Sequence, residues 1–145
     1  MKFWDSSAVV PLLIEEAGTQ HYSAVYARDA GMIVWWATEA ECVAALSRRE
    51  REAGDEGRQA IVDAFARLDE LVRHWSELAP AAEIKVNARR LLRTHPLRAA
   101  DAFQLAAALV ACEGKPATME FVCADARLVA AARLEGFTII APEIA

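Results

Sequence analysis

Four acidic residues occupy positions where carboxylates could cooperate in chemistry. Asp5 and Asp125 come at or just after the end of short segments rich in β-branched or aromatic residues, whereas Glu41 and Asp101 stand in the first turns of predicted helices. The neighbours of all four are mostly apolar. If the short segments are parallel strands, their carboxyl ends meet at one edge of a sheet. We therefore expect the four carboxylates to converge there.

Converging carboxylates need compensation, because like charges within a few ångströms repel unless one group is protonated or a cation lies between them. A set of hard oxygen ligands without His or Cys suits Mg²⁺ or Mn²⁺. Such a site can activate water and stabilise the charge that builds on a phosphate during in-line displacement. The residues alone therefore predict metal-dependent hydrolysis of phosphoester bonds.

Each acid also has a local structural explanation. Asp5 and Asp125 could cap the helices that follow them, and Asp101 in a first turn is favoured by the helix dipole. Thr38 and Glu41 fit a capping box, in which the Glu41 side chain reaches back to the Thr38 amide. Taken singly, these explanations stay open. The common placement of the acids at strand ends favours a shared site.

The elements that must position the acids follow from the hydrophobic pattern. β-branched and aromatic residues predict strands at residues 2–4, 32–36, 75–78 (the weakest), 121–123 and 137–140. Helical periodicity predicts helices at residues 7–15, 19–30, 38–52, 57–74, 81–93, 97–111 and 126–134. Strands that alternate with helices predict an α/β fold, with a parallel sheet covered on both faces.

Length and residue types narrow the class of protein. The 145 residues suit one domain, residues 1–145. No apolar run approaches the ~20 residues that cross a bilayer, so we expect a cytoplasmic protein with no membrane partner. Three dispersed cysteines, Cys42, Cys112 and Cys123, argue against a disulfide framework or a zinc site and are expected to be buried.

The net charge of −5 argues against a protein that coats nucleic acid by bulk charge. The four acids at the strand ends account for most of this excess. Without them, 17 of the 21 acids face 16 bases, a balance of −1. A nucleic acid, RNA or DNA, would then be bound through a cation and local arginines rather than through a basic surface.

The four acids lie in four segments that follow one another along the chain. Asp5 lies in Phe3-Trp4-Asp5-Ser6-Ser7-Ala8-Val9-Val10, and the other segments are residues 41–48, 97–106 and 121–136. In this order the segments resemble the motifs of PIN-domain nucleases, specifically the VapC toxins of toxin–antitoxin pairs. The resemblance spans essentially the whole chain.

The resemblance implies a three-layer α/β/α PIN-like fold around a five-stranded parallel sheet. It implies a Mg²⁺- or Mn²⁺-dependent endoribonuclease that forms a homodimer and binds an inhibitory antitoxin protein. Asp5 and Asp101 would be the core metal ligands, Glu41 would hold or orient the ion, and Asp125 would complete the shell or a second site.

Residues around this quartet complete the resemblance and depart from it. The hydroxyl of Ser6 or Ser7 is expected to position Asp5 or a water molecule. Gln104 stands where many relatives carry His, a difference that concerns substrate handling more than metal binding. Trp4 is bulkier than is common before the first acid and is expected to shape the pocket or pack beneath it.

Arginines and tryptophans near the motifs are further candidates for RNA contact. Arginine makes bidentate contacts with phosphate, but a solvated helix face explains each arginine equally well, so contact with RNA stays open for Arg48, Arg49, Arg93 and Arg98. Trp35-Trp36 could stack on bases. At the end of a predicted strand, one ring is expected in the core and the other in a lid or an interface.

The leading prediction is a toxin ribonuclease that hydrolyses RNA phosphodiester bonds with metal-activated water at the acidic quartet. The alternative is a PIN-like scaffold that binds RNA or protein without cleaving, which the presence of all four acids disfavours. A receiver-type signalling domain fits poorly, because Asp5 lacks an adjacent acid and no lysine follows the last predicted strand.

Overall fold

A five-stranded parallel sheet forms the centre of the computed structural model, which describes residues 1–142. The strand order is β3-β2-β1-β4-β5, and the central strand pairs with both neighbours through Phe3, which faces Ile33 on one side and Phe121 on the other. The strands are β1 (Lys2–Trp4), β2 (Met32–Trp35), β3 (Ser76–Leu78), β4 (Glu120–Val122) and β5 (Thr138–Ile140).

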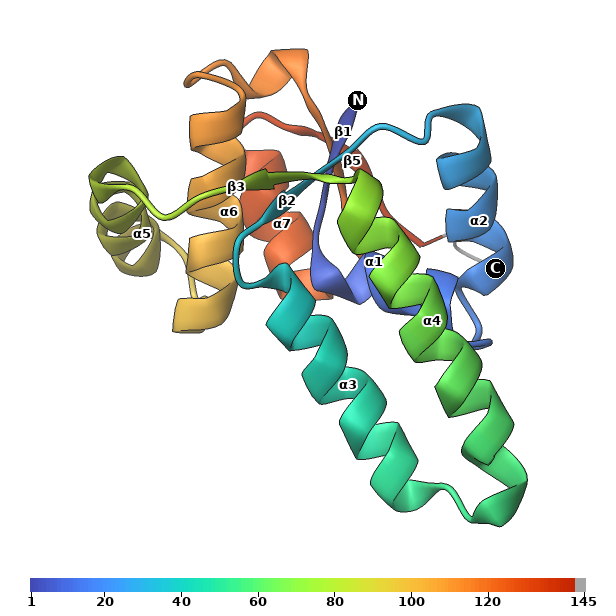
Figure 1. Ribbon diagram of the computed structural model, residues 1–145. Helices are drawn as coiled ribbons and strands as arrows, with labels where there is room; N and C mark the ends of the chain where they lie inside the picture. Colours follow the sequence, from blue (N-terminus) through green and yellow to red (C-terminus); the bar gives the residue numbers. More distant parts are fainter. Residues whose placement is uncertain (143–145) are drawn as a thin grey trace.

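Helices cover both faces of this sheet, which makes a three-layer α/β/α fold (Figure 1). One face carries α5 (Ala82–Thr94), α6 (Ala99–Ala111) and α7 (Ala126–Leu134). The other face carries α1 (Ser6–Leu13), α2 (Thr19–Arg28), α3 (Thr38–Glu52) and α4 (Arg58–His74). The predicted α/β fold class is therefore confirmed, with the five parallel strands and the three layers.

The two cores arise from the alternation of side chains along each strand. Phe3 points into the core beneath α5–α7 and stacks on Phe121, with ring centroids 5.5 Å apart. Trp4, the next residue, points to the opposite core and meets Tyr22 and Tyr26 edge-on, each at 6.4 Å. Trp4 is fully buried, so it packs beneath the site as expected.

Two features of the helical layers matter for the site. The helices α3, α6 and α7 all begin on the side of the sheet where the strands end (Figure 1). The hairpin of α3 and α4, joined through a short 3-10 helix (Asp55–Gly57), projects away from the sheet. The first turns of the helices therefore surround the carboxyl edge, and the hairpin tip lies far from it.

The predicted elements are all present, with small shifts at their ends. The helices 38–52 and 126–134 match to the residue, and the weakest strand prediction corresponds to β3. The helix predicted from residue 97 begins at Ala99, because Leu97 bonds back to the carbonyl of His95 in a turn. Within residues 1–142, no helix is both long and apolar enough to span a membrane.

Candidate active site

The four predicted acids lie around the carboxyl ends of the central strand β1 and its neighbour β4. Asp5 follows β1 directly, and Asp125 begins α7 three residues after β4 ends. Glu41 stands in the first turn of α3 and Asp101 in the first turn of α6. Because Trp4 pairs with Val122, the ends of β1 and β4 are adjacent in the sheet.

Asp5 is held rigidly inside this edge. Its side chain is 4% exposed, and its Oδ2 accepts hydrogen bonds from the Ser7 amide (3.0 Å) and the Ser7 hydroxyl. The same hydroxyl accepts from the Ala124 amide at 2.9 Å, which ties the end of β1 to the end of β4. Of the two predicted serines, Ser7 therefore positions Asp5.

Burial is the main reason that the pKa of Asp5 lies above its ordinary value. The hydrogen bonds from Ser7 act in the opposite direction, and the charges of Asp101 and Asp125 raise the pKa further. Cys123 lies against the same carboxylate, with its Sγ 3.7 Å from Oδ2 of Asp5. Asp5 is thus the N-cap of α1 and also a carboxylate whose charged form is disfavoured by its surroundings in the site.

Glu41 is turned into the site by a contact from the other side of the sheet. The buried Gln104 amide of α6 donates from Nε2 to Oε1 of Glu41, and also to Oγ1 of Thr38 at 3.0 Å. The capping-box interpretation is wrong, because Ala37 is the N-cap of α3 and has no side-chain cap. The Glu41 carboxylate is therefore committed to the site and not to its own helix.

The pKa of Glu41 is raised to about 7, chiefly by burial. The Gln104 hydrogen bond opposes this shift, as does one from Ser6, while the charges of Asp5 and Asp101 add to it. At neutral pH the carboxyl is therefore balanced between its charged and its neutral form. Any neighbouring positive charge would favour the charged form.

Asp101 and Asp125 complete the group on the α6–α7 side. Burial raises the pKa of Asp101, the charge of Asp125 raises it further, and the positive charges of Arg98 and Arg127 lower it. Asp125 also caps α7, since its Oδ1 accepts from the Leu128 amide at 3.0 Å. The capping explanation and the site placement both hold for Asp125.

The carboxylates suit a hard divalent cation by donor type, because oxygen ligands without thiolate or imidazole match Mg²⁺ or Mn²⁺. Asp5, Glu41 and Asp101 each have a pKa raised in part by other members of the quartet, a conflict that a cation would relieve. Within residues 1–142, however, no three His, Cys, Asp or Glu side chains form a group that could hold a metal ion as they stand. The carboxylates influence one another electrostatically without forming a closed cage.

Sequence reasoning missed how three other residues serve this site. Gln104 was noted only as a departure from a family pattern, whereas its amide links α6 to α3. Thr38, the second partner of that amide, was assigned to a cap. Cys123 is free and buried as predicted, but its thiol also contacts Asp5. Among the described residues, Oε1 of Gln104 is a buried atom without a hydrogen-bond partner.

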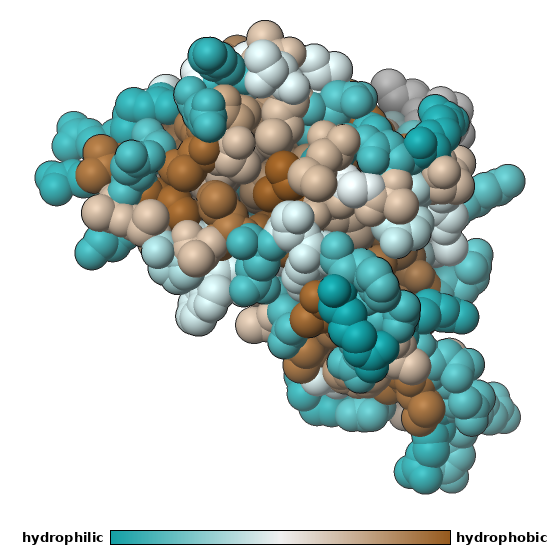
Figure 2. All heavy atoms as spheres, turned by 45° about the horizontal axis from the view of Figure 1, so that its top comes forward, coloured by the Kyte–Doolittle hydropathy of each residue, from teal (hydrophilic) through white to brown (hydrophobic). Residues whose placement is uncertain are grey.

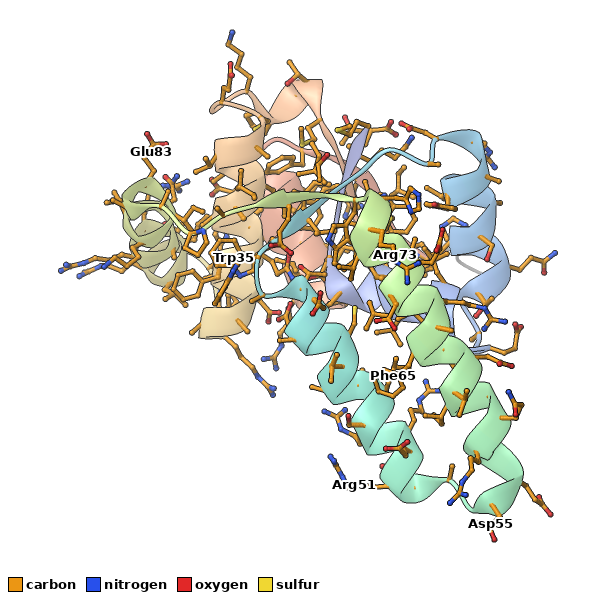
Figure 3. The ribbon with its side chains drawn as sticks, viewed as in Figure 1. Trp35, Arg51, Asp55, Phe65, Arg73 and Glu83 are labelled. Carbon is orange, nitrogen blue, oxygen red and sulfur yellow. The ribbon has the colours of Figure 1, made fainter. Side chains whose placement is uncertain are left out.

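The arginines differ in their surroundings. Arg49 pairs with Glu16, whereas Arg48 and Arg93 enter no ion pair in the described part of the chain. Figure 3 shows Arg51 towards the far end of the projecting hairpin, away from the strand ends. Arg98 is close enough to Asp101 to lower its pKa, and Arg127, which the sequence did not single out, does the same.

The fold defined by these elements is also found among solved structures. The chain is similar to PAE2754 from Pyrobaculum aerophilum, with a TM-score of 0.63 and 19% identity over 90% of this chain and 78% of that chain. No family model and no curated protein matches the sequence. At 19% identity, the similarity supports the three-layer α/β/α fold and says nothing of activity.

Proposed function

We propose that this protein is a Mg²⁺- or Mn²⁺-dependent endoribonuclease that hydrolyses phosphodiester bonds at the acidic quartet. The observation that carries the proposal is the electrostatic coupling of four acids from β1, α3, α6 and α7 at one sheet edge. Raised pKa values in such a group are typical of functional sites. The resemblance of the four segments to VapC toxins supports RNA as the substrate.

The roles of the residues follow from their surroundings. Asp5 and Asp101 would hold the ion, Glu41 would orient it, and Asp125 would complete the shell. Bound Mg²⁺ or Mn²⁺ would supply activation of the attacking water and neutralise charge on the phosphate. Ser7 fixes Asp5, the Gln104 amide fixes Glu41, and Asp101 has two cationic neighbours.

The two cations near Asp101 are Arg98 and Arg127. They suit the phosphate groups beside the scissile bond, because guanidinium groups make paired hydrogen bonds with phosphate oxygens. In this proposal the acids and the arginines have different roles. The acids retain the ion, and the arginines retain the RNA backbone.

The proposal extends to the biological setting. We infer a cytoplasmic toxin that acts as a homodimer and is inhibited by a cognate antitoxin protein encoded beside it. Coexpression with each adjacent small reading frame tests this part. If every such frame left RNA cleavage unchanged, the toxin assignment would be withdrawn while the nuclease could stand.

RNA cleavage by the purified protein tests the activity. We expect cleavage with Mg²⁺ or Mn²⁺, none with EDTA, and a loss of more than about 100-fold in Asp5→Asn and in Asp101→Asn, since even the partners of metal ligands are worth about 10–100-fold. Asp69→Asn, an exposed acid on α4, is the matched control. Undiminished cleavage by both site variants would overturn the site, and RNA binding without cleavage would support the scaffold alternative.

A further inference from the structure

An apolar hollow lies beside the acidic quartet, at the carboxyl ends of the next two strands. It has a volume of about 480 Å³ and its walls include Trp35, Trp36, Pro80, Ile84, Lys85 and Phe103. Small-molecule sites typically measure ~300–1,000 Å³ and combine apolar walls with few polar groups. This hollow has that character, with a single charged side chain, Lys85, in its lining.

Three aromatic rings shape the hollow. Trp35 is 7% exposed and stacks on Phe103, with centroids 6.0 Å apart and planes 3° from parallel. Trp36 meets Trp35 edge-on at 6.4 Å and remains 56% exposed. The prediction that one of the two rings lies in the core is therefore confirmed, with Trp35 as the core ring. The Trp36 ring packs against Trp35 on one side and is open to solvent on the other.

The hollow and the quartet share their framework. β2, which ends at Trp35, lies next to β1, which ends before Asp5. Phe103 stands on α6 two residues after Asp101, and Trp36 precedes α3, which carries Glu41. Figure 3 shows Trp35 beside the start of α3. A single-stranded chain lying along the carboxyl edge would pass from the acids to the hollow.

A row of cations leads away from the hollow along α5. Lys85, Arg89 and Arg93 recur every four residues, so they lie along one face of the helix, and all three are exposed. In the described chain none of them enters an ion pair. Arg90, one position beyond Arg89, instead pairs with Glu135 at 2.6 Å. The unpaired row is complementary in charge to a phosphate backbone.

Exposed apolar groups gather near the same row. Val86 and Leu92 of α5 are 70% and 41% exposed. Figure 2 shows hydrophobic surface on the side of the molecule where α5 lies. Aromatic rings beside a row of cations are the combination by which proteins hold single-stranded nucleic acid.

We propose that the hollow binds an unpaired nucleobase of the RNA substrate by stacking on Trp36, while Lys85, Arg89 and Arg93 contact the phosphates next to it. This subsite rests on the proposed nuclease function, to which it adds the requirement for an unpaired base beside the cleaved bond. A nucleobase fits the hollow better than a charged group does, because the walls are almost wholly apolar.

The test is binding of a short single-stranded RNA, measured by fluorescence anisotropy in EDTA so that no metal-dependent cleavage interferes. Trp36→Leu should weaken binding about 5- to 150-fold, the effect of removing one stacked base, and Trp36→Phe should restore most of it. Leu134→Ala, an exposed apolar residue of α7, is the control and should bind like wild type. Thermal unfolding confirms that each variant is folded.

The row of cations on α5 is tested by the salt dependence of RNA binding. Lys85→Gln, Arg89→Gln and Arg93→Gln should each reduce the slope of log affinity against log salt by roughly 0.7. An abasic RNA should bind the wild-type protein as weakly as normal RNA binds Trp36→Leu.

Unchanged RNA affinity in Trp36→Leu would overturn the subsite while leaving the nuclease intact if cleavage persists. A change in oligomeric state with unchanged RNA affinity would likewise overturn it and assign the hollow to self-association. Loss of cleavage in Asp101→Asn together with normal Trp36-dependent binding would support both proposals. Absence of RNA binding by the wild-type protein would overturn the subsite, whereas the nuclease proposal is decided separately by cleavage with Mg²⁺ or Mn²⁺.

Discussion

The carboxyl edge of the sheet has two sides with opposite chemistry. Beside the ends of β1 and β4, the buried Asp5 and the partly buried Glu41 and Asp101 have pKa values that neighbouring acids help to raise. At the ends of β2 and β3, aromatic rings and a proline enclose an apolar hollow with a lysine in its lining. The strands are alike in length and direction, so the difference comes from the residues after the strands and from the helices beside them, α6 carrying both Asp101 and Phe103.

Under the two proposals, one side of the edge would hold the cation and the other side would hold a base of the RNA. On the acidic side, burial and mutual repulsion disfavour the charged carboxylates, which costs stability and which a bound cation would relieve. The aromatic side leaves the apolar face of Trp36 exposed, where a planar ligand would stack under the proposal. The helices α3 and α6 border both sides, so the two stay in fixed register with each other.

Removing the Gln104 amide is the sharpest way to disturb the acidic side alone. In Gln104→Met the side chain keeps a similar length but cannot donate to Glu41, so affinity for Mn²⁺ should fall about 10–100-fold. Direct titration with Mn²⁺ measures this without any cleavage. In a Glu41→Gln background the same change should cost nothing further, because Gln104 acts through Glu41.

Thr38→Val is the matched control for Gln104→Met. It removes the other partner of the amide and leaves the bond to Glu41 in place. A Mn²⁺ affinity as low as that of Gln104→Met would show that the contribution is general packing rather than positioning of Glu41. Unchanged affinity in Gln104→Met would contradict the role of the amide altogether.

The raised pKa values of the acids also predict how the stability of the fold depends on pH. Asp5, Glu41 and Asp101 have raised pKa values, so the folded chain retains protons that the unfolded chain has released. The free energy of unfolding should therefore fall as pH rises above the ordinary carboxyl pKa values of about 4, and the Glu41 part of this fall is complete above about 7. The midpoint of thermal unfolding should drop by about 2–4 °C for each kcal/mol lost.

Two acids work in the other direction but at lower pH. The pKa values of Asp29 and Glu135 are lowered, by bonds to the N-terminal amine and to Arg90 respectively, and their effect is lost only below their ordinary values. Glu41→Gln should flatten the fall above pH 5, and added Mg²⁺ should reverse it in the wild-type protein. If the midpoint of thermal unfolding stayed constant as pH rises above about 4, the pKa values of Asp5, Glu41 and Asp101 would not be raised in the folded protein.

The smallest expected effect concerns the arginines on the acidic side. Arg98→Gln and Arg127→Gln should each reduce the salt dependence of RNA binding by roughly 0.7 in slope, through loss of a phosphate contact. Arg73→Gln is the control, because Arg73 pairs with Glu70 on α4 at 2.8 Å (Figure 3). If all three variants showed the same slope of log affinity against log salt, Arg98 and Arg127 would make no phosphate contact. The cation row of α5 would then be the sole electrostatic contact with the RNA.

The sequence predicted the elements well because alternation and helical periodicity are local signals. The helix 38–52 matches to the residue, and the acids lie at strand ends and first turns as expected. The error at Glu41 arose because two partners for its carboxylate were possible. The local one fitted a known motif, while the true partner, Gln104, lies 63 residues further along the chain.

Other features of the site also depend on contacts between distant segments. The Cys123 thiol reaches Asp5 only because β4 pairs with β1. The hollow exists only because β2, α5 and α6 meet, although Trp35 and Trp36 could be singled out in advance. The residues that could do chemistry were identifiable from the sequence. Which of them lie together at the sheet edge became clear only from the fold.

The most direct test of the account is Mn²⁺ binding, followed by electron paramagnetic resonance, in the wild-type protein and in two variants. We predict that the wild type binds Mn²⁺, that Asp5→Asn loses this binding, and that Trp36→Leu retains it. This result would assign the cation to the acidic side of the edge alone. Equal binding by the wild type and Asp5→Asn, or no binding by the wild type, would contradict the account.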